Sequence, residues 1–418
     1  MNKTVFLIID GMADLPIKTL NNKTPLEYAY KPNLSSFLKH SVLAYPSVLG
    51  KLAPQSDSGV MADLGYDPIK YSTGRGWFEC LGLGMEPRSG DLSLRVNFGR
   101  VDNGLLKEVR VYMSKPELHQ LEAEINEKVK LEVPFEFKSG EGYRGGLILR
   151  SKNKPFSPFV SNNELGYTAK FYPHGKKLSF ATDVKSKRVK KIKAERAEAA
   201  YTAGILNEFV EKSSDVIKRS SVYKDRKKEG LEVPNYLFLR DGAAADPELP
   251  DINDKYGRRW AAVVGMPLER GIAKAAGMSV IQGVHEEQDL NIDFSNKAEA
   301  TTAALRKFDA VYLHIKQTDA VSHLGKYTEK YMILEKIDKI VIKRLSSALN
   351  QSNGDSLIIT CDHATSSILR RHINSNIPVL ISNDKFKASK EFSESSCRSN
   401  HINQIKKATD IMPFAMKL

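Results

Sequence analysis

At residues 310–323 the chain reads AVYLHIKQTDAVSH, an apolar run that ends in a cluster of polar side chains. The six residues AVYLHI are typical of a strand buried on both faces of a sheet. His314 lies at the end of this strand, and Lys316, Asp319 and His323 follow it closely. Because ligands of open α/β sheets bind beyond the carboxyl ends of the strands, the stretch predicts a core strand that ends at a ligand or metal site.

Five further apolar runs are typical of buried strands, and helical patterns separate most of them. They are TVFLII (4–9), NYLFLR (235–240), AAVVG (261–265), SLIIT (356–360) and IPVLIS (377–382). Helices are expected over 194–218, 267–276, 297–307 and 327–349. This alternation predicts an α/β fold with a largely parallel sheet and helices on both faces.

The chain of 418 residues is long enough for a large core and a second domain. Between residues 96 and 194 the pattern changes to VNFGRVDNG, a helical PELHQLEAEINEKVK and VPFEFKSGEGYRGGLILRS. The last segment predicts an antiparallel hairpin that turns near Gly140–Gly142. We expect an inserted α+β domain over 96–194 and a core formed by 1–95 and 195–418.

The formal net charge of +13 suits a nucleic acid, an anionic membrane surface or a phosphorylated small molecule as partner. The basic run VKSKRVKKIKAER at 184–196 contains no aromatic residue. It therefore favours a solvated linker or helix face over a nucleic-acid patch. We expect a small phosphorylated substrate and no nucleic-acid or membrane partner.

The chain shows no signal for export or membrane insertion. MNKTVFLIIDG is too short an apolar stretch for a secretory signal, and no run of about 18 apolar residues occurs. Cys80, Cys361 and Cys397 are odd in number and irregularly spaced, which indicates neither a disulfide framework nor a zinc-thiolate site. We expect a soluble protein of the cytoplasm.

Acidic and histidine side chains gather where the predicted strands end. They are Asp10, Asp319, His323, Asp362, His363 and His372. Asp319 and His323 are spaced i,i+4 and so share one helix face. Each residue alone could be a helix cap or a surface pair, but their coincidence at strand ends favours a metal site. Mixed oxygen and nitrogen ligands suit zinc, manganese or cobalt better than an all-oxygen magnesium site, and two ions could clamp a phosphoryl group.

A candidate nucleophile lies in KLAPQSDSGVMADLGYDP, where a turn leads into an apolar helical run. Ser56 or Ser58 could be an N-cap of that helix. A serine in this place could also be a nucleophile, because the helix N-terminus stabilises an anion and a metal would lower the hydroxyl pKa.

A series of motifs in one order resembles the archaeal type of cofactor-independent (2,3-bisphosphoglycerate-independent) phosphoglycerate mutase, of the alkaline phosphatase superfamily. The motifs are IIDGMAD, PQSDSGVMADLGYDP, YSTGRGWFECLGLG, HIKQTDAVSH, CDHATS and HINSNIPVLI. The resemblance runs from Thr4 to about Ser382 and is thin in the inserted region. It implies an alkaline-phosphatase-like core that interconverts 3-phosphoglycerate and 2-phosphoglycerate through a phosphoserine, with two divalent ions (Mn, Zn, Co or Mg).

The resemblance also implies roles for single residues. Ser56 matches the nucleophile of the family, and Lys316 matches a lysine that meets the phosphate or the leaving oxygen. One ion would be held by Asp10, Ser56, Asp362 and His363, and the other by Asp319, His323 and His372.

The inserted domain would act as a cap that excludes water and retains glycerate. Arg75 in TGRG and Arg144 in GYRGG match family arginines and would bind carboxylate or phosphate. An ordinary surface salt bridge is the alternative for each.

The chain departs from the family pattern mainly in the substrate pocket. Gln55 replaces a glycine, Trp77 a proline and Leu324 an aspartate, and Asp241 stands where an arginine is expected. An arginine-rich segment after RVDNG and an Asp-Pro-His element are missing. A related phosphomonoester or phosphonate hydrolase on the same core therefore stays open, as does a basic interaction protein with a decayed site. The sequence does not specify an oligomeric state.

Overall fold

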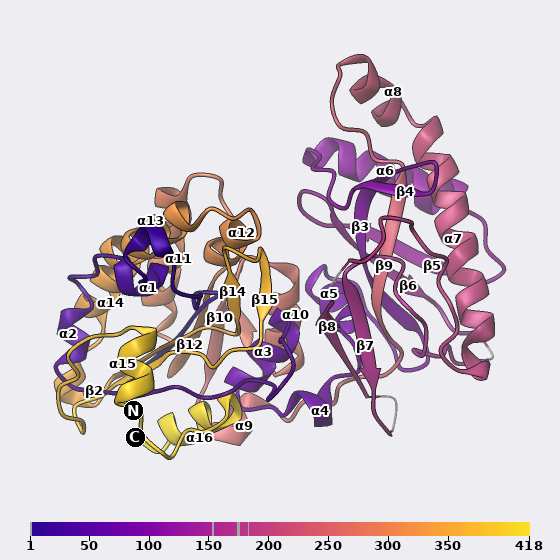
Figure 1. Ribbon diagram of the computed structural model, residues 1–418. Coiled ribbons are helices and arrows are strands. Elements are labelled where there is room, and N and C mark those ends of the chain that lie inside the picture. The colour runs from indigo at the N-terminus through magenta and orange to yellow at the C-terminus, as the bar shows by residue number, and fades with distance from the viewer. Residues whose placement is uncertain (1, 153, 174–175, 183) are drawn as a thin grey trace. The chain divides into compact units, whose positions relative to one another are not determined.

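The computed structural model describes residues 2–152, 154–173, 176–182 and 184–418. The chain divides into two compact units. The first unit comprises Met1–Pro68 and Leu249–Leu418, and the second comprises Ile69–Glu248. Figure 1 labels most of the elements of each unit.

The first unit is built on a seven-stranded sheet in the order β11-β10-β12-β1-β13-β16-β2. The central strand β1 (Thr4–Ile9) pairs in parallel with β12 (Ala310–Ile315) and β13 (Ser356–Thr360). Every residue of these three strands is buried, so both faces of the sheet centre are covered. The outer strands are β2 (Ser41–Ala44), β10 (Trp260–Val263), β11 (Ser279–Val280) and the antiparallel β16 (Val379–Ser382). The predicted α/β fold with a mostly parallel sheet is confirmed.

The register brings the carboxyl ends of the three central strands level. Ile9 lies opposite Ile315 of β12, and Ile8 lies opposite Thr360 of β13. Because the strands are parallel, the residues that follow them emerge at one edge of the sheet.

Most helices of this unit lie between its strands in sequence, and α15 and α16 follow the last strand (Figure 1). The helix predicted over 297–307 starts earlier, because Asp289 accepts hydrogen bonds from two backbone N–H groups and caps it. The helix predicted over 327–349 is interrupted by a π-helical turn at Asp338–Ile342. The set is α1 (Pro25–Tyr28), α2 (Ser35–Leu38), α3 (Ser56–Asp63), α9 (Ile252–Tyr256), α10 (Pro267–Ala275), α11 (Leu290–Ala304), α12 (Gln317–His323), α13 (Tyr327–Ile337), α14 (Lys343–Ala348), α15 (Glu394–Ser399) and α16 (Ile411–Ala415), with a small hairpin of β14 (Ala364–Ser366) and β15 (Arg371–Ile373).

The second unit contains an antiparallel sheet around β3 (Leu92–Asp102). β3 pairs with β6 (Arg144–Leu149) and β9 (Tyr236–Ala243), and β5 (Phe135–Ser139) forms the predicted hairpin with β6. The remaining elements are α4 (Pro68–Tyr71), α5 (Arg75–Gly82), β4 (Leu105–Glu108), α6 (Lys115–Lys128), β7 (Tyr167–Phe171), β8 (Lys177–Ala181), α7 (Ala200–Arg219) and α8 (Ser221–Lys228).

One strand prediction is wrong in its placement. The run at 235–240 was expected in the largely parallel core sheet, but it belongs to β9, which is antiparallel to β3 in the second unit. Apolar content alone does not distinguish a parallel core strand from a central antiparallel strand that is buried on both faces.

The two faces of this antiparallel sheet differ in chemistry. Leu92, Leu94, Val96 and Phe98 of β3 join an apolar core with residues of α6 and α7. The alternate residues include Arg95 and Asn97, which are buried on the opposite face.

The second unit is wider than the segment expected at 96–194. α5 precedes that segment and packs against β3, β6 and β9, and β9 follows it and pairs along most of β3. These contacts place 69–95 and 195–248 in the same compact unit. Among the described residues, no helix combines the length and apolar character needed to cross a bilayer.

Candidate active site

Acidic residues follow two adjacent central strands of the first unit, and neither is exposed to solvent. Asp10 follows β1 and Asp362 lies just after β13. Gly11 has a φ of 61°, and its N–H donates a hydrogen bond of 3.1 Å to Asp362 Oδ1. A Cβ at this position would lie 2.5 Å from Thr365 Oγ1, so the turn that links the two acids requires glycine.

A first group of ligand atoms forms around His363, which is buried beside both acids. His363 Nε2 lies 3.5 Å from Asp10 Oδ1, 3.2 Å from Asp362 Oδ2 and 3.2 Å from Ser56 Oγ. Among the described residues, Asp10 Oδ1 and Asp362 Oδ2 have no hydrogen-bond partner. Buried carboxylate oxygens without partners fit a missing cation.

A second group of ligand atoms surrounds Asp319. His323 Nε2 and His372 Nε2 each lie 3.3 Å from Asp319 Oδ1, and the two nitrogens are 3.2 Å apart. Their Nδ1 atoms face the carbonyl oxygens of Arg370 and Pro54, at 3.1 and 2.8 Å. Because a carbonyl only accepts hydrogen bonds, each Nδ1 carries the proton and each Nε2 lone pair points at Asp319, as metal-binding imidazoles do.

The hydrogen bonds of Thr365 determine the tautomer of His363. The Thr365 hydroxyl donates to Asp319 Oδ1 at 2.8 Å and lies 3.0 Å from His363 Nδ1. Since that hydroxyl proton is used, Nδ1–H donates to Thr365 and the Nε2 lone pair faces Ser56. The six predicted ligands, Asp10, Asp319, His323, Asp362, His363 and His372, are therefore brought together, and we call them the metal-ligand cluster.

Lys316 bridges the two groups of acids. Its Nζ lies 2.8 Å from Asp10 Oδ2 and 2.6 Å from Asp319 Oδ2. Burial opposes its charge, but these two carboxylates raise the pKa of the lysine above its ordinary value. Burial also opposes ionisation of Asp319, yet Lys316 holds its pKa well below the usual range.

Asp362 lacks such compensation. Burial and then the neighbouring Asp10 raise its pKa well above the ordinary value. Its ionised form therefore needs more positive charge than Lys316 supplies, and divalent ions would provide it.

The two candidate serines differ in their surroundings. Ser58 Oγ donates to Gln55 O at 3.0 Å and accepts from Gln55 N, so it belongs to the helix cap of α3. Ser56, the first residue of α3, instead directs its hydroxyl to His363. It is 3% exposed, at a helix N-terminus that favours negative charge.

The second unit carries buried arginines on the polar face of its sheet. Arg75 and Arg95 both pair with Glu79, at 2.8 and 3.2 Å, and hold the pKa of Glu79 at about 2 although burial opposes it. Arg240 pairs with Glu164 at 3.4 Å. We call the following residues the arginine cluster: Arg75, Arg95, Arg110, Arg144 and Arg240.

Tyr143 lies among these arginines, and the pKa of its hydroxyl depends on their positive charge. The guanidinium groups of Arg144 and Arg110 lie 4.5 and 5.5 Å from the Tyr143 ring. Burial would raise the pKa of Tyr143, but Arg144, Arg110 and Arg95 lower it to about 8.

Sequence reasoning found Arg75 and Arg144 but missed the other three members. The sequence signal for Arg95 is the alternation in LSLRVNF, where polar residues recur at every second position. The signal for Arg240 is the arginine at the end of the apolar run YLFLR. Arg110 lies in KEVRVYM, where no arginine-rich motif was found.

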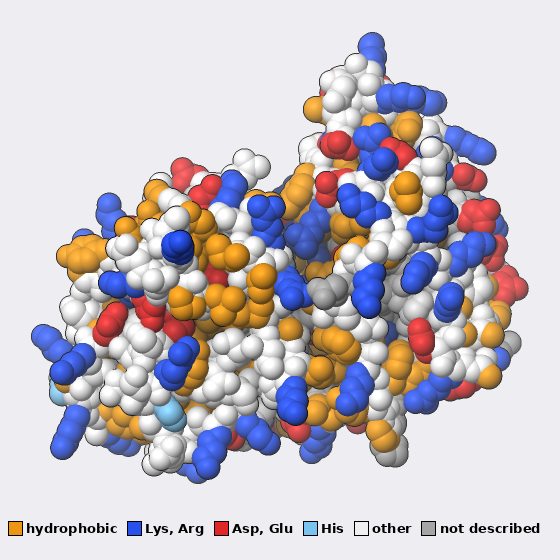
Figure 2. Space-filling model, in the orientation of Figure 1, with side chains coloured by type: hydrophobic (Ala, Val, Ile, Leu, Met, Phe, Trp, Pro, Cys, Tyr) orange, Lys and Arg blue, Asp and Glu red, His pale blue; other side chains and the backbone are white. Residues whose placement is uncertain are grey.

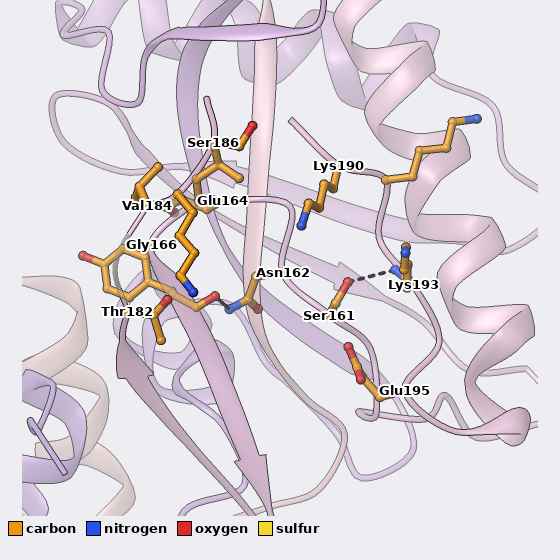
Figure 3. A pocket seen from close by; sticks show the side chains of 14 residues that line it. Ser161, Asn162, Glu164, Gly166, Thr182, Val184, Ser186, Lys190, Lys193 and Glu195 are labelled. Atoms are coloured by element: carbon orange, nitrogen blue, oxygen red, sulfur yellow. Dashed lines mark hydrogen bonds between the residues drawn. The ribbon is translucent and has the colours of Figure 1, made fainter. Parts of the chain in front are cut away.

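A pocket of about 390 Å³ lies in the second unit and is lined in part by Lys185, Lys190, Lys191 and Lys193 of the basic run (Figure 3). Ser161 Oγ accepts a hydrogen bond of 2.9 Å from the Lys193 backbone N–H. These lysines are exposed. On the visible face in Figure 2, basic side chains are spread among acidic and apolar ones rather than gathered in one stripe.

The fold and the site define an α/β protein whose metal-ligand cluster lies at the carboxyl ends of parallel strands. Residues 44–223 match the family model described as 2,3-bisphosphoglycerate-independent phosphoglycerate mutase. The mutase of that name from Thermococcus kodakarensis is 32% identical over 100% of this chain and 97% of its own length, and that of Pyrococcus furiosus is 33% identical with the same coverage. The chain belongs to the 2,3-bisphosphoglycerate-independent phosphoglycerate mutase family.

Two solved structures are similar to this chain over its whole length. A protein of Pyrococcus horikoshii aligns with a TM-score of 0.78 and 26% identity, over 100% of this chain and 97% of that one. The cofactor-independent phosphoglycerate mutase of Thermoplasma acidophilum aligns with a TM-score of 0.61 and 25% identity, over 100% and 99%.

Proposed function

We propose that this protein interconverts 3-phosphoglycerate and 2-phosphoglycerate and that Ser56 carries the phosphoryl group between them. One observation carries the proposal: the Ser56 hydroxyl points at His363 Nε2, 3.2 Å away, inside a buried set of acids and imidazoles. The family membership supplies the substrate.

Two divalent ions complete this site in the proposal. Asp10, Ser56, Asp362 and His363 would hold one ion, and Asp319, His323 and His372 would hold the other. Such ions lower the pKa of a serine hydroxyl and neutralise charge on a transferring phosphoryl group. Manganese, zinc, cobalt and magnesium are the candidates, and the imidazoles favour the first three.

Side chains of the protein would bind the phosphate and the carboxylate of the substrate. Lys316 lies between the two groups of acids and would donate hydrogen bonds to the phosphate or to the leaving oxygen. Arg75 and Arg144 would bind the carboxylate or phosphate of the substrate, and Arg95, Arg110 and Arg240 extend this candidate surface.

The second unit would serve as a cap. A mutase has to keep water from a phosphoserine, which would otherwise be hydrolysed, and has to retain glycerate between the two transfers. The buried free thiols Cys80, Cys361 and Cys397 suit a reducing compartment, and we propose the cytoplasm.

The experiment is a coupled assay without added bisphosphoglycerate. Metal-free protein should be inactive, and manganese should restore conversion of 3-phosphoglycerate into 2-phosphoglycerate. Hydrolysis of p-nitrophenyl phosphate measures the competing activity in the same samples. Hydrolysis without mutase turnover would overturn the proposal in favour of a phosphomonoester hydrolase.

A further inference from the structure

The basic run at 184–196 forms an extended segment whose backbone is fixed to its neighbours in the second unit. Leu106 N–H of β4 donates a hydrogen bond of 2.8 Å to Lys187 O. Asn207 of α7 accepts a hydrogen bond of 2.9 Å from Ile192 N–H and donates one of 2.8 Å to Ile192 O. The fold therefore determines where the backbone of each lysine in this run lies.

The alternation of the extended segment places lysines on one side of it. Ile192 is 3% exposed and packs in the apolar core of the unit. Because neighbouring side chains of an extended chain point to opposite sides, Lys191 and Lys193 point away from that core. Ser161 pairs with the same segment, since its N–H donates to Lys193 O and its Oγ accepts from Lys193 N–H, both at 2.9 Å. These lysines and Ser161 line the pocket of about 390 Å³ (Figure 3).

The ammonium groups that line this pocket are not neutralised by acids. Among the described residues, none of the four lysines Lys185, Lys190, Lys191 and Lys193 forms an ion pair. Two acids also line the pocket, but Glu164 is itself paired with Arg240 at 3.4 Å, and Glu195 is exposed to solvent. Four unpaired positive charges thus border one concave space, which favours an anion with several negative charges.

The shape of the site indicates which kind of anion fits. Single-stranded nucleic acids bind along extended basic grooves with aromatic side chains that stack on the bases, whereas these lysines border one pocket and the basic run has no aromatic residue. The pocket volume of about 390 Å³ lies within the range of small-molecule sites. A single phosphate group would leave most of the lysines unpaired. A chain of two or three phosphate groups carries about as many negative charges as the pocket has lysines.

We propose that Lys185, Lys190, Lys191 and Lys193 bind a small molecule that carries a chain of two or three phosphate groups, such as pyrophosphate or a nucleoside diphosphate. The ammonium groups would donate charge-assisted hydrogen bonds to the phosphate oxygens. The site goes beyond the proposed function, because none of these lysines has a part in that reaction scheme.

The pocket adjoins the arginine cluster, so the two anion sites have to be distinguished. Glu164 lines the pocket and pairs with Arg240 of the cluster. Asn162, which also lines it, accepts a hydrogen bond of 3.0 Å from Asp241 N–H of β9. The cations of the two sites differ, since the pocket has lysines of the basic run and the cluster has arginines.

The test is isothermal titration calorimetry of the full-length chain with pyrophosphate, in a buffer without added divalent ions because pyrophosphate binds them. The wild-type chain should bind one pyrophosphate. Lys190→Ala combined with Lys193→Ala should raise the Kd about tenfold, because two charge-assisted hydrogen bonds are lost.

The matched control is Lys187→Ala combined with Arg188→Ala. It removes the same charge from the basic run, but neither residue lines the pocket. The Kd of this variant should change less than about twofold, because solvent and salt screen charges outside the site. An equal loss of affinity in both double variants would mean general attraction to the basic run and would overturn the proposal.

Two further titrations identify the site and the ligand. Saturating 3-phosphoglycerate should leave the pyrophosphate Kd unchanged, and competition between them would place the anion among the arginines and overturn the proposal. Tighter binding of ADP than of pyrophosphate would support a nucleotide as occupant, and equal or tighter binding of pyrophosphate would support the phosphate chain alone. Lack of binding of both compounds would overturn the proposal. None of these readouts uses turnover, so an inactive protein that binds pyrophosphate would contradict only the proposed function.

Discussion

The hydroxyl of Tyr143 measures the charge of the arginine cluster directly. Its pKa of about 8 lies below the ordinary value of 10.0, because three arginines stabilise the phenolate. We predict that one tyrosine titrates near pH 8 in ultraviolet difference spectra and that Tyr143→Phe removes this transition.

Inorganic phosphate adds a test of function to this titration. An anion bound among the arginines would offset their charge and move the Tyr143 pKa upward. Tyr112→Phe is the control, because its ring packs on Tyr143 at 4.9 Å while its own pKa is raised. If added phosphate does not shift the Tyr143 pKa, the result would argue against anion binding at this cluster.

At this scale the sequence singled out acids and histidines that the structure brings together, because strand ends are visible as the end of an apolar run. The sequence did not predict that Glu269 and Asp63 are buried, because each lies within a helical pattern, where an acid is usually exposed to solvent. The structure shows both to be buried.

A buried ion pair, Lys330 with Asp14, links elements of the first unit next to the metal-ligand cluster. Lys330 of α13 donates hydrogen bonds to Ala13 O, Asp14 Oδ2 and Thr365 O at 3.2, 3.0 and 2.9 Å. It thereby joins the turn after β1 to β14, and these segments follow Asp10 and His363.

Removal of the Lys330 charge should therefore destabilise the first unit. Lys330→Met leaves Asp14 buried without its cation and should lower the free energy of unfolding by about 3 kcal/mol in urea. The double variant Lys330→Met with Asp14→Asn should recover part of that loss. An unchanged urea midpoint would show that the pair does not hold the turns.

A second buried group links α1 and α15. Glu394 accepts hydrogen bonds from Thr24 Oγ1 and Asp14 N, and burial raises its pKa to about 7 despite the bond from Thr24. The folded chain thus keeps a proton that the unfolded chain releases above its ordinary pKa of 4.5. The resulting loss of stability grows as the pH rises from about 4.5 to 7.

Glu394→Gln removes this titration. The variant should gain stability relative to the wild type between pH 5 and 8, by on the order of 3 kcal/mol at most. Thermal unfolding of both proteins across this range is the measurement. A stability difference that does not change with pH would contradict a raised pKa.

At the scale of elements, the predicted parallel sheet was correct for β1, β12 and β13, because runs buried on both faces are continuous in sequence. The run at 235–240 was placed wrongly because its partner β3 lies far away in sequence. Pairing between distant strands leaves no local signal.

For the whole molecule, bound metal should act on one unit only. All the proposed ligands lie in Met1–Pro68 and Leu249–Leu418. A ligand that binds only the folded state adds about 2.7 kcal/mol at a hundred times its Kd. Mn²⁺ should therefore slow hydrogen exchange at 8–14, 314–323 and 361–366 and leave Ile69–Glu248 unchanged.

The contradicting result is an equal slowing of exchange in both units. It would mean that metal stabilises the molecule as a whole rather than through the metal-ligand cluster. Chelated protein provides the baseline for each peptide.

The extent of the second unit was only partly predictable. The change of pattern at 96–194 was visible, but 69–95 and 195–248 join the unit through packing of α5 and pairing of β9. Such tertiary contacts are not encoded in local composition.

The central claim is that Ser56, and not the neighbouring Ser58, carries the phosphoryl group. The most direct measurement is the intact mass of manganese-loaded protein, quenched in acid during turnover of 3-phosphoglycerate. Wild type and Ser58→Ala should each gain the mass of one phosphoryl group, and Ser56→Ala should gain none. A phosphorylated Ser56→Ala chain would contradict the account.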